Sequence, residues 1–280
     1  MSASSEKEIL ELDSGVYARL WHNMTNAGFI VGDKGVLVID SLGVPSFARD
    51  LIQDIRYVTN KPIQYVVDTH SHWDHSWGNE EFPEATIICH QNCPAEMVDI
   101  EWNDNWRRKV VTGNHPWSQE ASIVNITPPN LTFETSMQLY FGGREINLHY
   151  FGRAHTGGDI FIHLPKERIV FTGDVAQDRS VGYWGDCYPR DWPETVSRLL
   201  SLPVERFVSG HGPIGSYETL VEARNFIHQL VENLKNAKQE VQDEVTASNI
   251  TRAALNPQFG DWRGFDRIDE AILEVYRKLN

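Results

Sequence analysis

The chain is poor in cysteine, with only Cys89, Cys93 and Cys187 among its 280 residues. An odd number excludes a complete set of internal disulfides, and no two of the three form the C-x-x-C pair of many zinc and redox sites. Three residues separate Cys89 from Cys93, so they could be read as metal ligands, but no second pair accompanies them. We therefore expect ordinary thiols in a reducing compartment.

Basic residues and long apolar runs are also scarce. The chain has 25 Lys and Arg against 39 Asp and Glu, a net charge of −14, which argues against a nucleic acid or an anionic membrane as partner. It has no run of about 18 apolar residues, and residues 1–10 lack the basic start and apolar core of a signal peptide. We expect a cytoplasmic protein that acts on a small molecule, provided that no leader peptide has been removed. Nothing in the sequence indicates an oligomeric state.

The chain does have a dense cluster of metal-binding residue types. His70, His72, Asp74 and His75 form an H-x-H-x-D-H pattern directly after the apolar run Ile63–Val67. In an extended segment, residues i and i+2 point the same way, so His70 and His72 can bind one ion together. Asp74 and His75 follow a turn and can reach a second ion, roughly 3.5–4 Å from the first. A histidine-rich surface loop is the alternative, but scattered histidines rarely fall in this order beside a strand.

Three later motifs place further ligand types where a strand meets a loop. His155 lies in F-G-R-A-H-T-G-G-D, Asp174 in F-T-G-D and His211 in F-V-S-G-H-G-P. Each alone could be a hydrogen-bonded loop residue or a helix cap. Together with the first cluster they favour one metal centre, and imidazole with carboxylate suits zinc, iron or manganese.

The apolar patterns predict a mixed α/β chain. Strands are expected at residues 15–20, 27–31, 36–39, 63–67, 85–89, 131–133, 137–141, 145–150, 159–164, 168–172 and 206–209. Helices are expected at residues 46–59, 193–202, 216–244 and 266–279. Residues 93–122 fit neither period and predict an irregular or helical insertion bordering the site. This order favours a four-layer α/β/β/α sandwich over a doubly wound sheet, with a catalytic domain at 1–215 and a helical C-terminal extension at 216–280 packed on the same domain.

These motifs match, in order, those of the metallo-β-lactamase fold superfamily, which the chain resembles over residues 13–213. The opening strands A-G-F-I-V and V-L-V-I-D are also similar to that superfamily. The resemblance implies a hydrolase with two zinc ions, iron or manganese being possible substitutes. It implies these ligands: His70, His72 and His155 for the first metal, Asp74, His75 and His211 for the second, and Asp174 as the bridge.

Asp174 is where the subfamilies differ. The zinc β-lactamases most similar in layout have a cysteine here, whereas glyoxalase II-like thioesterases and lactonases carry the aspartate. Residues 182–196 resemble those β-lactamases, yet their substrate-binding lysine, expected at about Gln177, is absent. Overall the chain is most similar to uncharacterised hydrolases associated with sulfur oxidation or quinoprotein genes, and we expect at most weak β-lactamase activity.

The resemblance implies that a hydroxide shared by two metal ions cleaves an amide or β-lactam, ester, thioester or lactone. Asp74 would orient this nucleophile or pass on its proton. Tyr183 would donate a hydrogen bond to an oxyanion, as a tyrosine does in related lactonases. Asp40, Asp68 and Thr69 are candidates to fix the histidine rings. Trp73, Trp77, Tyr183 and Trp184 either wall the substrate pocket or pack the edge of the sandwich.

Other functions remain open at this stage. Iron at the same ligands would suit a persulfide dioxygenase-like oxidoreductase, and a lactone substrate would make the chain a quorum-signal lactonase. A flavodoxin-like domain, which related diiron proteins need, is absent from the sequence. A nuclease conflicts with the acidic charge, and a non-catalytic binding module conflicts with the complete set of ligands.

Overall fold

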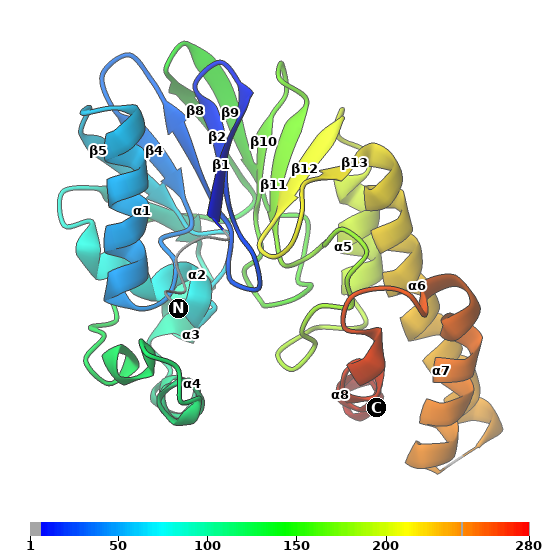
Figure 1. The fold of residues 1–280 in the computed structure, drawn as a ribbon. Helices are drawn as coiled ribbons and strands as arrows, with labels where there is room; N and C mark the ends of the chain where they lie inside the picture. The colour runs from blue at the N-terminus through cyan, green and yellow to red at the C-terminus, as the bar shows by residue number, and fades with distance from the viewer. Residues whose placement is uncertain (1–6, 242, 280) are drawn as a thin grey trace.

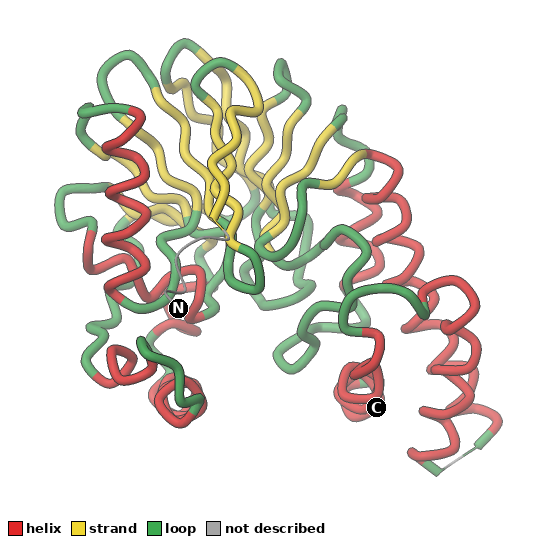
Figure 2. Tube along the Cα trace, in the orientation of Figure 1, coloured by secondary structure: helices red, strands yellow, loops and turns green. Residues whose placement is uncertain are grey.

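Two β-sheets pack face to face and carry helices on their outer sides (Figures 1 and 2). The structure is a computed structural model that describes residues 7–241 and 243–279. Within those residues, helix, sheet, sheet and helix follow one another as four layers. The predicted α/β sandwich is therefore confirmed.

The strands of the first sheet lie side by side in chain order, and their pairing changes from antiparallel to parallel half-way across the sheet. Its strands are β1 (Lys7–Asp13), β2 (Val16–Trp21), β3 (Ala27–Val31), β4 (Val36–Ile39), β5 (Ile63–Val67), β6 (Thr86–His90) and β7 (Leu131–Phe133). β1 to β4 pair antiparallel through short turns, and β4 to β7 pair parallel through longer connections. β1 was missed in the sequence, because an edge strand with mostly exposed, charged positions lacks a clear apolar signal.

The second sheet has the order β13-β12-β11-β10-β9-β8. Its strands are β8 (Ser136–Phe141), β9 (Arg144–His149), β10 (Phe161–Leu164), β11 (Ile169–Gly173), β12 (Arg206–Ser209) and β13 (Gly215–Ser216). Only the β11–β12 pair is parallel. Gly142 and Gly143 have φ angles of 61° and 75°, which a two-residue hairpin turn of this kind requires, and they join β8 to β9.

β4 shows how the layers are held together. Leu37 and Ile39 are buried in the cluster between the two sheets, whereas Val36 and Val38 are buried against α1 (Pro45–Val58). Successive side chains of a strand point to opposite faces, so a strand covered on both sides must be apolar throughout. The continuous run V-L-V-I thus places β4 in the interior of the sandwich.

The second sheet is covered by the C-terminal helices. They are α5 (Trp192–Leu199), α6 (Tyr217–Glu240), α7 (Glu244–Phe259), η3 (Phe265–Arg267) and α8 (Ile268–Lys278). The helix expected over residues 216–244 ends at Glu240, and α7 was missed because its apolar residues form no clear stripe and it contains Pro257. Apolar side chains of α6 and of β12 share one buried cluster. The division at residue 215 stays a prediction.

Residues 93–122 are largely helical and lie beside the first sheet (Figure 1). They contain α3 (Cys93–Met97), α4 (Ile100–Thr112) and η2 (Ser118–Ser122), and they follow the short α2 (Trp73–Ser76) and η1 (Trp77–Glu81). Asp99 caps α4, since its side chain accepts a hydrogen bond from the backbone N–H of Trp102. This cap fixes where α4 starts and so places Trp102 at the site.

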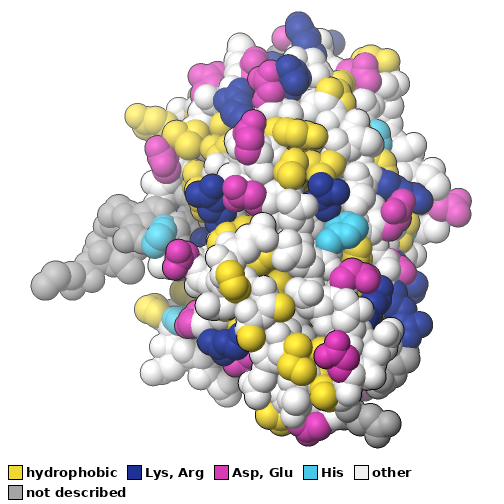
Figure 3. Space-filling model, turned by 90° about the vertical axis from the view of Figure 1, so that its right-hand side faces the viewer, with side chains coloured by type: hydrophobic (Ala, Val, Ile, Leu, Met, Phe, Trp, Pro, Cys, Tyr) yellow, Lys and Arg dark blue, Asp and Glu magenta, His cyan; other side chains and the backbone are white. Residues whose placement is uncertain are grey.

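On the face shown in Figure 3, basic and acidic side chains are interspersed, with no broad area of one sign. Among the residues that the structure describes, no helix is both long and apolar enough to cross a membrane.

Candidate metal centre

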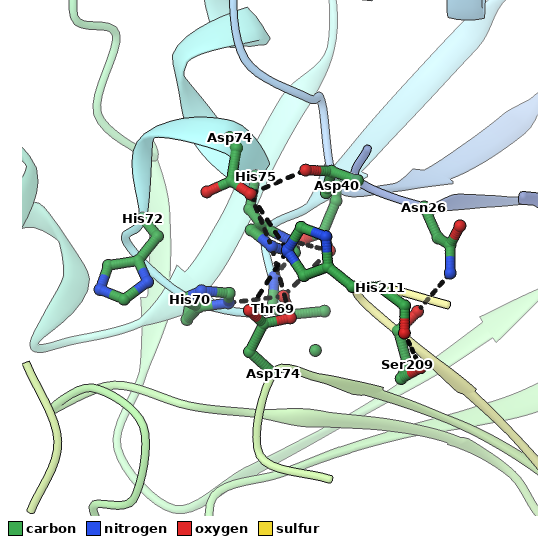
Figure 4. Close-up of polar contacts among 12 residues, drawn as sticks. Asn26, Asp40, Thr69, His70, His72, Asp74, His75, Asp174, Ser209 and His211 are labelled. Carbon is green, nitrogen blue, oxygen red and sulfur yellow. Dashed lines mark hydrogen bonds and ion pairs between the residues drawn. The ribbon is translucent and has the colours of Figure 1, made fainter. Parts of the chain in front are cut away.

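The seven predicted ligands come together at one end of the sandwich. Figure 4 labels all of them except His155. His70, His72, Asp74 and His75 follow β5 of the first sheet. The second sheet contributes the others: His155 in the β9–β10 connection, Asp174 directly after β11 and His211 shortly after β12. Residues separated by up to about 140 positions thus meet where strands of both sheets end.

The first group of donor atoms belongs to His70, His72 and His155, all buried. One nitrogen from each ring lies within 4.8 Å of the others. Nδ1 of His72 and Nε2 of His155 are 2.8 Å apart, and Nε2 of His70 is buried without a hydrogen-bond partner. These nitrogens converge as ligands of one ion do.

The second group joins Asp74, His75 and His211, again with donor atoms within 4.8 Å of one another. Asp174 lies between the groups: its Oδ1 is 3.6 Å from His75 Nε2, while its Oδ2 is 3.3 Å from His211 Nε2 and 3.7 Å from His155 Nε2. A single carboxylate therefore faces ligands of both groups, which is the geometry that a bridge needs.

Hydrogen bonds on the far side of the rings decide which nitrogen is available. His75 Nδ1 is 2.8 Å from Asp40 Oδ2, and His70 Nδ1 is 3.0 Å from Thr69 Oγ1. Since the Thr69 hydroxyl donates to Asp40, it must accept from His70. Both rings then carry their proton on Nδ1 and leave Nε2 free for a metal.

Two further rings are oriented by groups that the sequence did not reveal. His72 Nε2 lies 3.1 Å from Asp186 Oδ2, and His211 Nδ1 lies 3.1 Å from the carbonyl of Met24. Asp68 was expected to fix a histidine ring, but its carboxylate accepts a hydrogen bond from the Asn79 side chain instead. Asp186 and Met24 lie more than 100 positions from the rings they hold, so no local spacing could have identified them.

Asp74 and its neighbours set the electrostatics of the second group. Burial alone raises the pKa of Asp74, but His75 and His211 outweigh it and hold that pKa well below its usual range. Burial also lowers the pKa of His75, yet Asp74, Asp40 and Asp174 raise it to about 9. This part of the centre therefore favours positive charge.

The first group behaves differently, because fewer carboxylates lie near it. Burial lowers the pKa of His155 to about 3 and that of His70 well below its usual value. These imidazoles are neutral at pH 7, so their free nitrogens can bind a cation.

A divalent metal pair fits these residues. Nε2 of His70, Nε2 of His75 and Oδ1 of Asp174 are buried without partners, and buried polar atoms of this kind are costly unless something binds them. Five imidazoles and two carboxylates are also the donor types that zinc, iron and manganese accept. The clusters thus suggest a dinuclear metal site.

The aromatic residues near the centre separate into two kinds. Trp77 is 2% exposed and packs in the buried cluster between the first sheet and α1, with Arg107 over its ring. It therefore packs the edge of the sandwich and does not wall a substrate pocket. Trp184 is equally buried and stacks on Trp192. Tyr183 is 40% exposed, with its ring 5.9 Å from that of His72.

Tyr183, Trp102 and Trp106 are aromatic neighbours of His72, the last with its ring 6.2 Å away. Trp102, in α4, stacks on the His72 ring at 5.9 Å and its indole N–H donates to Asp186. Burial raises the pKa of Tyr183 well above its usual value, so its hydroxyl remains a donor at neutral pH. Trp73 instead packs with Trp106 and Trp117.

The cysteines lie outside these groups. Cys89, Cys93 and Cys187 are free and buried. Cys93 Sγ donates to the carbonyl of Gly158, which follows His155 in the A-H-T-G-G-D loop.

Curated proteins of two kinds are similar to this chain. The alpha subunit of 2,4-dinitroanisole O-demethylase from Nocardioides sp. (strain JS1661) is 27% identical over 203 residues, 70% of this chain and 56% of the subunit. The type 2 metallo-β-lactamase of Elizabethkingia meningoseptica is 24% identical over 218 residues, 74% of this chain and 79% of that enzyme. The chain therefore matches little more than half of the demethylase subunit.

Solved structures agree on the fold. A metallo-β-lactamase from Pontibacter korlensis superposes with a TM-score of 0.67 at 18% identity, covering 80% of this chain and 99% of that chain. A stereoselective inverting sec-alkylsulfatase from Pseudomonas sp. superposes with a TM-score of 0.76 at 15% identity, covering 97% of this chain and 50% of that chain. The sequence model of the metallo-β-lactamase superfamily matches residues 21–211 of this chain. The chain belongs to the metallo-β-lactamase superfamily.

Proposed function

We propose that the chain is a zinc-dependent hydrolase that holds two metal ions and cleaves a small carbonyl substrate. The observation that carries this proposal is the convergence of seven ligand side chains, four of whose rings are turned by a hydrogen bond on their far side. The substrate would contain an amide, ester, thioester or lactone.

When bound, two zinc ions lower the pKa of water from 15.7 to roughly 7 and polarise a carbonyl oxygen. The protein's own side chains do the positioning. Asp74 accepts a hydrogen bond of 2.7 Å from Thr25 and lies 3.2 Å from His211 Nε2, so its carboxylate is held at the open side of the centre. There it can orient the attacking water or take its proton. Tyr183 would donate to the developing oxyanion.

The named relatives and the sequence set the order of the alternatives. A β-lactam substrate is suggested by the β-lactamase relatives, but Gln177 stands where a lysine is expected, so we expect only weak turnover. A quorum-signal lactonase uses the same centre on another bond. An iron-dependent, persulfide dioxygenase-like oxidoreductase would use the same ligands with a different metal.

The cellular setting is part of the proposal. A cytoplasmic location agrees with the three free cysteines. A small-molecule partner, rather than nucleic acid or membrane, agrees with the charge of −14.

The test combines metal analysis with a substrate panel. We expect about two zinc ions per chain in the protein purified with its native metals, and hydrolysis of one among nitrocefin, a homoserine lactone and a glutathione thioester. Asp174→Ala should lose metal and lower kcat/KM by about 100-fold or more, since even indirect partners of metal ligands contribute about 10–100-fold.

The control is Asp33→Ala, which removes an exposed carboxylate in the β3–β4 turn, at the opposite end of β4 from Asp40. This variant should keep both the metal content and the kcat/KM of the wild type. If metal content stays far below two per chain, and Asp174→Ala alters neither metal content nor turnover, the dinuclear proposal fails. Stoichiometric iron without zinc would instead support the oxidoreductase.

A further inference from the structure

Two cavities flank the metal centre, and they differ in charge. The larger, of about 830 Å³, contains Asp174 and His211 in its wall and extends to α8. The smaller, of about 570 Å³, opens at His72 beside α4. The charged residues that line the larger cavity are Lys109, Asp174, Arg263, Arg267, Glu270, Glu274 and Arg277. Those that line the smaller one are Glu96, Asp99, Glu101 and Asp186, with no Lys or Arg among its described lining residues.

Arg263 is fixed beside the second group of ligands. Its backbone N–H donates to the carbonyl of Arg179, and its carbonyl accepts from Val181, so it joins the loop that follows Asp174. Its guanidinium lies against Gly212, the residue after His211: a methyl group added there would be 2.5 Å from Nη2. Gly212 also has a φ of +90°, which favours glycine. The Arg263 guanidinium thus lies beside the residue that follows His211.

Arg263 and Arg267 also have no side-chain partner within the part of the chain that the structure describes. Neither side chain makes a hydrogen bond or ion pair with any residue in the described ranges 7–241 and 243–279, although both line the larger cavity. Several other arginines at the surface of this acidic chain form ion pairs, for example Arg198 with Glu194 and Arg252 with Asp269. Two guanidinium groups left without carboxylates offer forked donors that match an oxyanion.

Gln177 lines the same cavity and is 6% exposed. It stands at about the position where the similar β-lactamases carry a lysine for the substrate's carboxylate. The loop after the bridge therefore offers a neutral amide, and Arg263 and Arg267 of the connection between α7 and α8 bring guanidinium groups to the same cavity. Figure 1 shows α4 and α8 at the lower edge of the molecule, on opposite sides of the two sheets.

We propose that Arg263 and Arg267 bind an oxyanion group, carboxylate or sulfate, on the substrate of this centre. The four carboxylates of the smaller cavity repel such a group, so the substrate enters in one direction, with its anionic end toward α8 and its reactive carbonyl at Asp174 and His211. The identity of the reactive group rests on the proposed function, whereas the anion site does not.

Binding is tested first, with ligands that cannot be hydrolysed. Levulinate and its longer keto-carboxylate homologues are compared with their neutral carboxamides and with keto-sulfonates, by calorimetry on the full-length, metal-loaded protein. We expect the best anion to bind about tenfold or more tightly than its carboxamide, because hydrogen bonds between ionised groups are the strong ones. Arg263→Gln and Arg267→Gln should each remove most of that preference, and Arg263→Lys should keep part of it. A preference for sulfonate over carboxylate would identify the oxyanion as sulfate-like.

The control is Arg198→Gln, which removes the same charge from the exposed face of α5. It should leave the preference intact. Equal binding of anion and carboxamide, or a preference that both glutamine variants retain while remaining folded by circular dichroism, overturns the anion site.

Turnover separates the two proposals. The enzyme could be active, yet have the same kcat/KM for a monomethyl dicarboxylate and its neutral dimethyl ester, and keep that kcat/KM in Arg263→Gln. This result would refute the anion site and leave the proposed hydrolase function intact. Anion-selective binding that Arg263→Gln removes, in a protein that hydrolyses no carbonyl substrate, would retain the anion site and reject the hydrolase.

Discussion

Asp40 is the residue that ties the two groups of ligands together. Its Oδ2 accepts from His75, a ligand of the second group, and from Thr69, which in turn orients His70 of the first. Its Oδ1 accepts the backbone N–H of Thr69. It takes a φ of 63°, a left-handed conformation that Asp and Asn tolerate better than most residues. One carboxylate thus sets the protonation of two rings.

Asp40→Asn tests this role with little change in size or backbone preference. The amide can present one oxygen where the carboxylate presents two, so an N–H donor faces either His75 or Thr69. We expect metal affinity to fall by about 10–100-fold, measured by competition with a chromogenic chelator. Asp33→Asn, in the exposed β3–β4 turn, is the matched control. Unchanged affinity in Asp40→Asn would show that Asp40 does not set the tautomers.

Residues of the centre differ in how visible they are in the sequence. His70, His72, Asp74 and His75 fall within six consecutive positions, so their spacing along the chain alone indicates that they share a site. Asp186 lies 114 positions from the ring it holds, and only the folded chain brings them together. Trp102 likewise reaches His72 because its helix is capped at Asp99, which no metal motif records.

Among the helices and strands, too, some were evident from the sequence and others were not. β4 was evident because a strand buried on both faces is apolar throughout. The helix α6 was evident from its apolar stripe, but its end at Glu240 and the start of α7 were not, since both depend on how the chain turns back on itself. α6 and α7 pack through Phe226, which touches Phe259 at 5.2 Å between ring centroids. Periodicity identifies a face that must be buried without naming what covers it.

Phe226→Ala is the corresponding prediction for these elements. The side chain is 2% exposed and lies among Trp184, Phe259 and Trp262. Truncation should lower the free energy of unfolding by about 3–5 kcal/mol, through lost burial and the cavity left behind, measured by urea denaturation. Glu232→Ala, on the exposed side of the same helix, should stay within about 0.5 kcal/mol of wild type. A loss in Phe226→Ala no larger than in this control would mean that residues 216–280 do not form one cooperative unit with the sheets.

At the scale of the whole molecule, the site closes one end of the sandwich. Asn26 precedes β3 of the first sheet, and its side chain donates to the carbonyl of Ser209, the last residue of β12 in the second sheet (Figure 4). It also donates to the carbonyl of Gly212, which follows β12. The ligands are divided in the same way, four after β5 and three from the second sheet. A metal pair held by all seven would join the two sheets at this end.

Metal removal should therefore destabilise the whole fold rather than the site alone. A ligand present at about 1,000 times its dissociation constant stabilises the native state by about 4.1 kcal/mol, and each kcal/mol shifts the Tm of a chain this size by about 2–4 °C. We expect a chelator to lower the Tm by roughly 8–16 °C, measured by calorimetry, and zinc to restore it. In Asp174→Asn, which weakens the carboxylate facing both groups, the chelator should have a much smaller effect. If the chelator strips the metal and the Tm of wild type does not move, the metals do not join the sheets, because any ion bound by the native state alone must raise its stability.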